Sequence, residues 1–176
     1  DGGEVRVGDV VVALASDGLH TNGYSLARRV VFESLGLTVD DPFPDEDGTV
    51  ADVLLRTHRS YLKALLPILR EDRIRALAHI TGGGFTGNVC RVLTSSTDAV
   101  IETRKWKPLP VFQALANHGE VSFDELYEVF NMGVGMVLVV APEAVDATIE
   151  IARTFKHKAW TIGEICSGDG SVHVVA

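Results

Sequence analysis

An unbroken apolar run from Val10 to Ala15 constrains this chain more than any other feature. A strand with one face in water alternates apolar and polar side chains, whereas this run has no polar position. It therefore predicts a strand that is buried on both faces of a sheet. Ser16-Asp17-Gly18 follows directly, and these turn-forming residues are expected to end the strand.

The rest of the chain alternates between short apolar runs and helical spacing. Apolar runs predict strands at 76–80, 98–103, 134–141, 159–165 and 171–175. Amphipathic spacing and capping signals predict helices at 24–35, 50–66, 111–117 and 142–155, and one that opens at the capping box 122–125. Gly36 and Gly119 are expected to end two of these helices, and Pro67 to distort or end the second.

The connections complete the expected architecture. Segment 40–48 has two prolines and five acidic residues, which predicts an exposed loop. The last two strands are joined by Ser167-Gly168-Asp169-Gly170, which favours an antiparallel hairpin. We expect a mixed β-sheet covered by helices, of the α/β or α+β class, in a single domain over residues 1–176.

Composition excludes several classes of function. A formal net charge of −8 argues against a general nucleic-acid binder. No stretch approaches the ~20 apolar residues of a membrane helix, and the first residues do not resemble a signal peptide, so we expect no membrane contact and a cytoplasmic location. Cys90 and Cys166 lack partners at zinc-ligand spacing, and both are expected to be buried thiols.

A first candidate site lies in the turn between the buried strand and the next helix. Ligands of open α/β sheets bind at this end of a strand. The polar and glycine residues that crowd there are Ser16, Asp17, Gly18, His20, Thr21, Asn22 and Gly23. A turn with helix-capping side chains is the alternative, but capping explains neither the imidazole nor two glycines in one link.

A second candidate is the run His79-Ile80-Thr81-Gly82-Gly83-Gly84, with Asn88 and Arg91 on the next predicted helix. Consecutive glycines lose much backbone entropy on folding, so they indicate that something lies close to the main chain. A phosphate held by backbone amides is one interpretation, and a tight turn under a packed helix is the other. His79 is either catalytic or a buried, hydrogen-bonded histidine.

A third glycine-containing segment, Phe130 to Met136, stands at the entry of a predicted strand. A bulge or close backbone packing explains its glycines, and Asn131 is the side chain in it that is suited to reach a ligand.

Taken together, these three segments resemble the phosphoribosylformylglycinamidine cyclo-ligase (AIR synthetase) family in order and spacing. The similarity extends to Gly8-Asp9-Val10, Trp160 and Ile162-Gly163, and it covers nearly all of the chain. It corresponds to the C-terminal half of that family's enzyme. The resemblance implies that a separate N-terminal domain supplies most of the ATP site and the main contact of a homodimer.

The resemblance also implies an activity, which is the ATP-driven closure of an imidazole ring on formylglycinamidine ribonucleotide. ATP and Mg²⁺ would be held mainly by the N-terminal half, with no metal ligand in this chain. His20 and Asn22 would touch the reacting end of the substrate. Thr81, Gly82, Gly83 and Gly84 would hold a phosphate, preferably the ribose 5′-phosphate rather than the γ-phosphate of ATP.

Several positions depart from the family pattern. Asp17 stands where a second serine is usual, and Thr21 where serine is common. The stretch 56–61, which includes Thr57 and His58, replaces a usual Pro-Thr-Arg-Ile-Tyr, and Gly87 replaces an acidic residue. Two alternatives stay open: a related ATP-using enzyme of the selenophosphate synthetase, thiamine-phosphate kinase, hydrogenase-maturation or formylglycinamidine synthetase type, and a non-catalytic domain that binds a phosphorylated metabolite.

Overall fold

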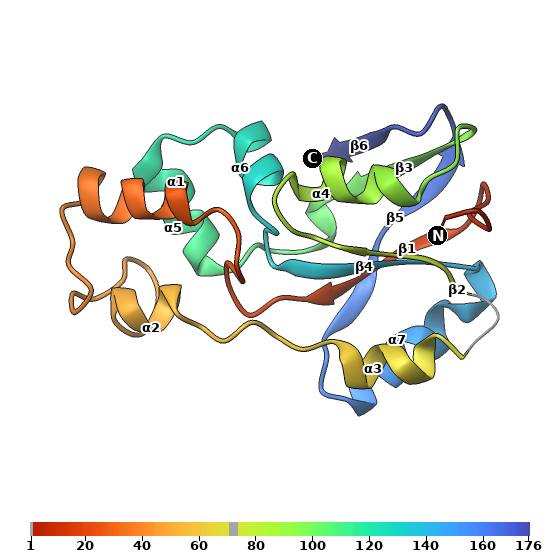
Figure 1. Cartoon of the computed structure of the whole chain (residues 1–176), viewed down its shortest axis with the longest axis horizontal. Coiled ribbons are helices and arrows are strands. Elements are labelled where there is room, and N and C mark those ends of the chain that lie inside the picture. Colours follow the sequence, from red (N-terminus) through yellow and green to blue (C-terminus); the bar gives the residue numbers. More distant parts are fainter. Residues whose placement is uncertain (1, 71–73) are drawn as a thin grey trace.

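The computed structural model describes residues 2–70 and 74–176. They form a six-stranded sheet in the order β2-β4-β1-β5-β3-β6 (Figure 1). The strands are β1 (Val10–Ala15), β2 (Ile74–His79), β3 (Thr97–Glu102), β4 (Val134–Val140), β5 (Ala159–Ser167) and β6 (Val172–Val175). The helices are α1 (Tyr24–Arg28), α2 (Val50–Leu54), α3 (Leu62–Ile68), α4 (Gly84–Val89), α5 (Pro110–Gly119), α6 (Phe123–Val129) and α7 (Val145–Thr154).

The apolar run forms β1, an interior strand that is buried on both faces, as predicted. β1 pairs antiparallel with both β4 and β5. Val11 and Ala13 enter one hydrophobic core, and Val12 and Leu14 enter a second one. Because successive side chains of a strand point to opposite faces, these two cores lie on the two sides of the sheet. A mixed sheet covered by helices is therefore confirmed.

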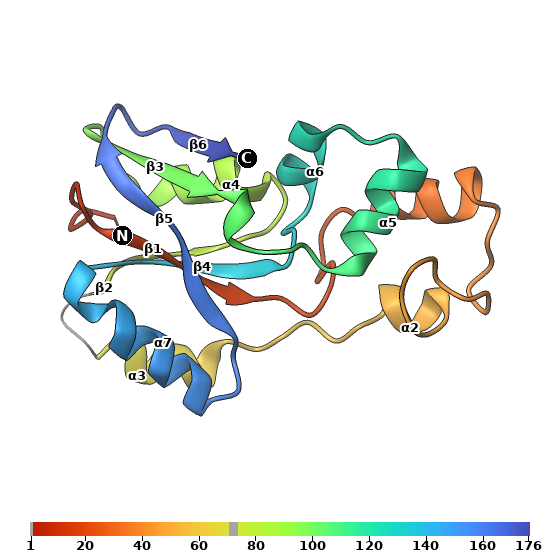
Figure 2. The same ribbon diagram turned by 180° about the vertical axis from the view of Figure 1, so that it is seen from behind.

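The two cores have different covers (Figures 1 and 2). On one face, α3 and α7 lie together and enclose Val12 and Leu14 with Ile68 and Ala152. On the other face, α4 and α6 pack together, and α1, α2 and α5 lie beyond the end of β1. The larger core is on this second side and includes Phe85, which has no exposed surface.

The predicted closing hairpin is wrong. β3 lies between β5 and β6, pairing antiparallel with β5 and parallel with β6. Asp98 of β3 provides the physical reason, because its Oδ1 accepts hydrogen bonds of 2.8, 3.0 and 2.8 Å from the backbone N–H groups of Asp169, Gly170 and Ser171. Gly168 lets this carboxylate approach, since a Cβ there would lie 1.8 Å from its Cγ. The connection therefore crosses over β3.

The single helix predicted over 50–66 is also wrong. The structure has two helices, α2 and α3, joined by a non-helical link over residues 55–61. Thr49 caps α2, with its side chain accepting a hydrogen bond from the Asp52 N–H. In the link, Tyr61 is buried and donates a 2.9 Å hydrogen bond from its hydroxyl to the Ala15 carbonyl. Such tertiary contacts override helical spacing.

The predicted helix ends and the predicted burial of the cysteines were only partly correct. Gly36 adopts φ +65° after the first helical segment, which continues past α1 as a π-helix over Arg29–Ser34. α5 ends at Gly119, but the left-handed residue is Glu120. Pro67 lies inside α3, one residue before its end. The two cysteines are not both buried, since Cys90 is exposed and Cys166 is half-buried. None of the helices in the described residues is long and apolar enough to cross a membrane.

Candidate functional site

The three segments singled out in the sequence meet at one edge of the sheet. Leu14 of β1 and His79 of β2 both pair with Met136 of β4. Since β4 runs antiparallel to both neighbours, the ends of β1 and β2 lie beside its beginning. Backbone hydrogen bonds continue past the strands, from the Ser16 N–H to the Gly133 carbonyl at 2.9 Å and from the Ile80 N–H to the Gly135 carbonyl at 3.0 Å.

Asn131 holds the loop that follows β1. Its Oδ1 accepts a 2.7 Å hydrogen bond from the Ser16 hydroxyl and a 2.9 Å bond from the Gly133 N–H. Its Nδ2 donates to the carbonyls of Gly18 at 2.8 Å and Leu19 at 3.3 Å. Asn131 and Ser16 are both 3% exposed. Both residues were predicted to bind substrate, and in the structure their side chains form hydrogen bonds within the protein that fix the loop.

His20 is buried at the centre of this loop, with 4% of its surface exposed and a backbone φ of +60°. Its Nε2 accepts a 3.3 Å hydrogen bond from the Asp17 N–H, whereas its Nδ1 is buried and has no hydrogen-bond partner within residues 2–70 and 74–176. Burial above all, and then the nearby rings of His58 and His79, lowers the pKa of His20 to about 4. The imidazole is therefore neutral near pH 7.

Gly135 makes room for His20 and Tyr61. A Cβ at this position would lie 1.9 Å from the Tyr61 hydroxyl oxygen and 2.7 Å from His20 Cε1. The expected close packing at this strand entry is confirmed, and the packed partners are side chains of the site itself. Burial raises the pKa of Tyr61, so its phenol stays protonated.

Asp17 is held by Arg59 of the 55–61 link. Arg59 Nε donates a 2.7 Å hydrogen bond to Asp17 Oδ2, and its Nη2 binds the other carboxylate oxygen. This bidentate pair ties the loop after β1 to the link. Asp17, predicted to bind substrate, is therefore already paired within the chain.

The remaining residues of the first segment differ in exposure. Thr21 is exposed, Asn22 is half-buried and Gly18 is buried. Gly23 has φ +77° and stands at the start of α1, where a Cβ would lie 2.2 Å from the Phe130 ring. Packing alone therefore requires the glycine at position 23.

The glycine run forms the turn into α4, and its three glycines differ. Gly83 and Gly84 have φ of +94° and +55°, and a Cβ at Gly84 would lie 1.7 Å from the Tyr127 carbonyl oxygen. Gly82 has no such constraint, since the nearest atom to its Cβ position is Asn22 Oδ1 at 3.6 Å. The interpretation as a turn under a packed helix thus holds for Gly84, while Gly82 faces the first segment.

Asn88 of α4 stabilises this turn. Its Nδ2 donates to the carbonyl oxygens of Thr81, Gly82 and Gly84 at 3.2, 3.3 and 2.7 Å. The Thr81 hydroxyl in turn donates to Asn88 Oδ1 at 3.0 Å. These bonds turn the carbonyls towards the helix and hold the loop in one conformation.

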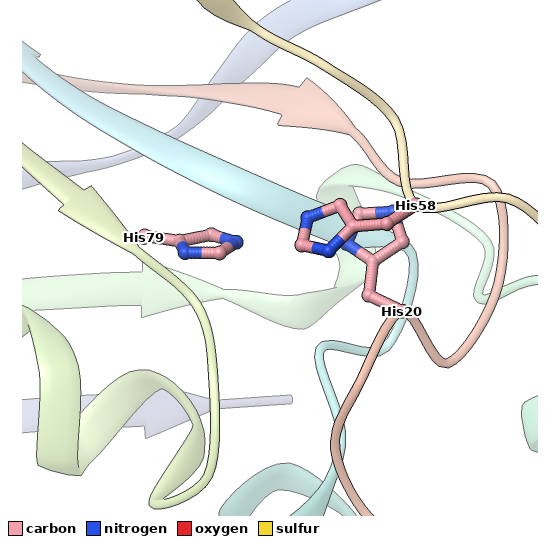
Figure 3. Close-up of side chains that lie close together, drawn as sticks. All are labelled: His20, His58 and His79. Carbon is pink, nitrogen blue, oxygen red and sulfur yellow. The ribbon is translucent and has the colours of Figure 1, made fainter.

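His79 is exposed, so the alternative of a buried, hydrogen-bonded histidine is wrong. Partial desolvation, followed by the nearby His58, lowers the pKa of its ring. The His79 ring centroid lies 5.2 Å from that of His58, and the His58 ring stacks on His20 at 4.0 Å with an interplanar angle of 18° (Figure 3). Three imidazoles thus meet at the site.

Sequence reasoning missed the contribution of the 55–61 link. His58, Arg59 and Tyr61 all reach the site from this segment, which helical spacing had assigned to a helix. One signal was present, since this stretch departs from the family pattern. A departure identifies a position but does not say which side chains it brings together.

The fold is shared with several enzymes and maturation proteins of low sequence identity. A hydrogenase maturation protein, HypE of E. coli, superposes with a TM-score of 0.64 at 15% identity, over 100% of this chain and 49% of that chain. Thiamine-monophosphate kinase from Stenotrophomonas maltophilia K279a gives a TM-score of 0.61 at 16% identity, over 97% of this chain and 51% of that chain. These similarities define an AIR-synthase-like fold.

Sequence comparison identifies the family. The chain belongs to the family described as AIR synthase related protein, C-terminal domain, whose model matches residues 6–176. A phosphoribosylformylglycinamidine cyclo-ligase of Geotalea uraniireducens (strain Rf4) is 42% identical over 165 residues, which is 94% of this chain and 47% of that protein. One from Streptococcus mutans is 46% identical over 152 residues, which is 86% of this chain and 44% of that protein. The chain thus spans about half the length of these relatives.

Proposed function

We propose that this chain is the C-terminal half of a phosphoribosylformylglycinamidine cyclo-ligase, which closes the imidazole ring of aminoimidazole ribonucleotide at the expense of ATP. The names of relatives at about 40% identity support the proposal. The observation that carries it is the convergence of the loop after β1 with the glycine run, where a Cβ at Gly82 would lie 3.6 Å from Asn22 Oδ1.

The proposed reaction has two steps. Phosphoryl transfer from ATP to the formyl oxygen makes that oxygen a leaving group. An amidine nitrogen then attacks the formyl carbon, the ring closes, and phosphate departs with the former formyl oxygen. A proton must leave the attacking nitrogen, and general acid–base groups usually perform such transfers.

His20 is the residue that we assign to the reacting end. Because its pKa is lowered to about 4, it is neutral at working pH and can exchange hydrogen bonds without adding charge. Its Nε2 accepts from the Asp17 N–H, which in the neutral ring leaves the proton on Nδ1. That Nδ1–H has no hydrogen-bond partner among the described residues, and we assign it as the donor to a substrate oxygen or nitrogen. Asn22, two residues further along the same loop, is the amide that we assign to the same end of the substrate.

The ribose 5′-phosphate is assigned to the turn 81–83. The Gly84 N–H already donates to the Thr81 carbonyl at 3.0 Å, so this amide is not counted among the phosphate ligands. A cavity of about 540 Å³ lies on the α6 side of Gly83, but Asp124 and Glu128 line it and their carboxylates repel an anion. We therefore assign the phosphate to the side of the turn that faces Asn22.

ATP and Mg²⁺ are assigned to the N-terminal half. Magnesium prefers carboxylate and other oxygen ligands. Within the described residues, the one cluster of three or more possible metal ligands consists of histidines, which does not fit Mg²⁺.

The function is tested by combining this chain with an N-terminal half. The 176-residue chain alone should form no aminoimidazole ribonucleotide, and the two halves joined in one polypeptide should form it together with ADP. Turnover by this chain alone would contradict the division of labour. A folded, joined protein without cyclisation would contradict the assigned function.

The phosphate assignment is tested at Gly82 in the joined protein. Gly82→Val places a side chain beside Asn22 without a positive φ to strain, so KM for the ribonucleotide should rise while the fold persists. Gly83 is less suitable, because its φ of +94° would strain any side chain. Gly87→Ala is the control, since no atom of the described residues lies within 4 Å of its Cβ position. An unchanged KM in folded Gly82→Val would refute the assignment.

A further inference from the structure

Three histidines from distant parts of the chain form a cluster that the proposed reaction does not fully use. His20 follows β1, His58 lies in the link between α2 and α3, and His79 ends β2 (Figure 3). Each offers a ring nitrogen, and these nitrogens all lie within 4.8 Å of one another. Among the residues that the structure describes, no other group brings three possible ligands together.

The spacing is close to that of a metal site. Zinc binds histidine nitrogen at about 2.0–2.1 Å, which in a tetrahedral site places the nitrogens roughly 3.3 Å apart. Movements of about 1.5 Å would therefore close the cluster on an ion. His20 is buried and fixed by its loop, whereas His58 is half-buried and His79 is exposed, so these two rings have room to turn.

The chemistry of the three rings fits a cation. Neutral imidazole nitrogens are common ligands of transition metals, and all three side chains of the cluster are imidazoles. His20 Nδ1 is buried and has no hydrogen-bond partner among the residues that the structure describes, so this polar atom of the cluster is left for a ligand.

We propose that His20, His58 and His79 form a binding site for a divalent transition-metal ion, with Zn²⁺ as the reference ion. Three imidazoles and no carboxylate select zinc, copper, nickel or cobalt over magnesium and calcium. Three protein nitrogens leave the fourth position of a tetrahedral ion to water, which reaches the site from the exposed His79 side.

The site is tested by titrating the 176-residue chain with Zn²⁺ in a calorimeter and with Co²⁺ in a visible-absorption spectrometer. We expect one ion per chain, cobalt bands typical of low-coordinate nitrogen ligation, and no comparable binding of Mg²⁺. Absence of a one-to-one complex with Zn²⁺ and Co²⁺ would overturn the proposal.

His58→Phe keeps an aromatic ring stacked on His20 but removes the donor nitrogen. The loss of one ligand should weaken binding by about tenfold or more, since even outer-shell partners are worth about 10–100-fold. His79→Ala, at an exposed position, should have the same effect and guards against misfolding of the first variant. His118→Ala, on the exposed side of α5, is the matched control and should bind as the parent does. Equal affinity of parent and both cluster variants would also overturn the proposal.

Discussion

Replacing Asn131 by aspartate should destabilise the chain by about 2–4 kcal/mol. The substitution keeps the Oδ1 acceptor and its bonds to Ser16 and Gly133, but it replaces the Nδ2 donor by an oxygen. That oxygen would face the carbonyls of Gly18 and Leu19, now 2.8 and 3.3 Å from Nδ2. A buried acceptor left without its donor costs about 1–3 kcal/mol, so two such groups would cost about 2–6 kcal/mol, and the long 3.3 Å bond to Leu19 places the expected loss in the lower part of that range.

The pH dependence of Asn131→Asp has a definite sign. Burial disfavours the ionised form, so the introduced carboxyl has a folded-state pKa above its unfolded value of about 3.9. A group of this kind loses stability as the pH rises through the folded pKa. The deficit relative to the parent should therefore be smallest in acid, where the protonated carboxyl can again donate to one carbonyl.

Urea unfolding of the 176-residue chain at several pH values measures the effect. Asn131→Asp should lower the urea concentration at the midpoint and leave the slope of the unfolding free energy against urea concentration unchanged. Asn117→Asp on the exposed side of α5 is the control and should change stability by less than about 0.5 kcal/mol. If Asn131→Asp costs less than about 1 kcal/mol, the hydrogen bonds do not hold the loop. An effect confined to substrate binding in the joined protein would instead favour the predicted ligand contact.

Three further predictions concern single contacts. Gly84→Ala should destabilise by about 2–4 kcal/mol in urea unfolding, because it combines a positive φ with a clash against the Tyr127 carbonyl, whereas Gly82→Ala should be near neutral. Hydrogen bonds from His173 first, and then from loop amides, lower the pKa of Asp98 to about 2. The stability of the parent should therefore fall as the pH drops from about 4 towards 2, and Asp98→Asn should lack this part of the acid dependence. Thr49→Ala should cost about 1 kcal/mol by removing the cap of α2, and an unchanged unfolding midpoint would contradict the cap.

The sequence predicted the positions of the strands along the chain better than which strands pair with each other. The run Val10 to Ala15 has no polar position, and only a central strand with a core on each face satisfies it. The closing hairpin failed because one carboxylate, Asp98, draws the connection across β3. A long-range contact of this kind leaves no periodic trace in the sequence.

The candidate site was also only partly predictable from the sequence. Glycines near strand ends indicated where the main chain is approached closely, and Gly135 shows such an approach to Tyr61 and His20. The histidine cluster was not predictable, since the spacing between His20, His58 and His79 follows no structural period. It forms because residues 55–61 are a non-helical link, although their spacing favours a helix, and this link carries His58 to the ends of β1 and β2.

The central position of β1 has a consequence for the synthesis of the chain. In β1, Val10 pairs with Val140 of β4 on one side and with β5 on the other. This apolar strand is therefore synthesised well before either of the strands with which it pairs. At about 5–20 residues per second, the 130 residues between Val10 and Val140 take roughly 7–26 s to emerge from the ribosome. During this interval the Val10 to Ala15 segment combines high β-propensity with no charge, which is the composition that chaperones and aggregating chains recognise. Expression at a slower translation rate would lengthen that exposure rather than shorten it.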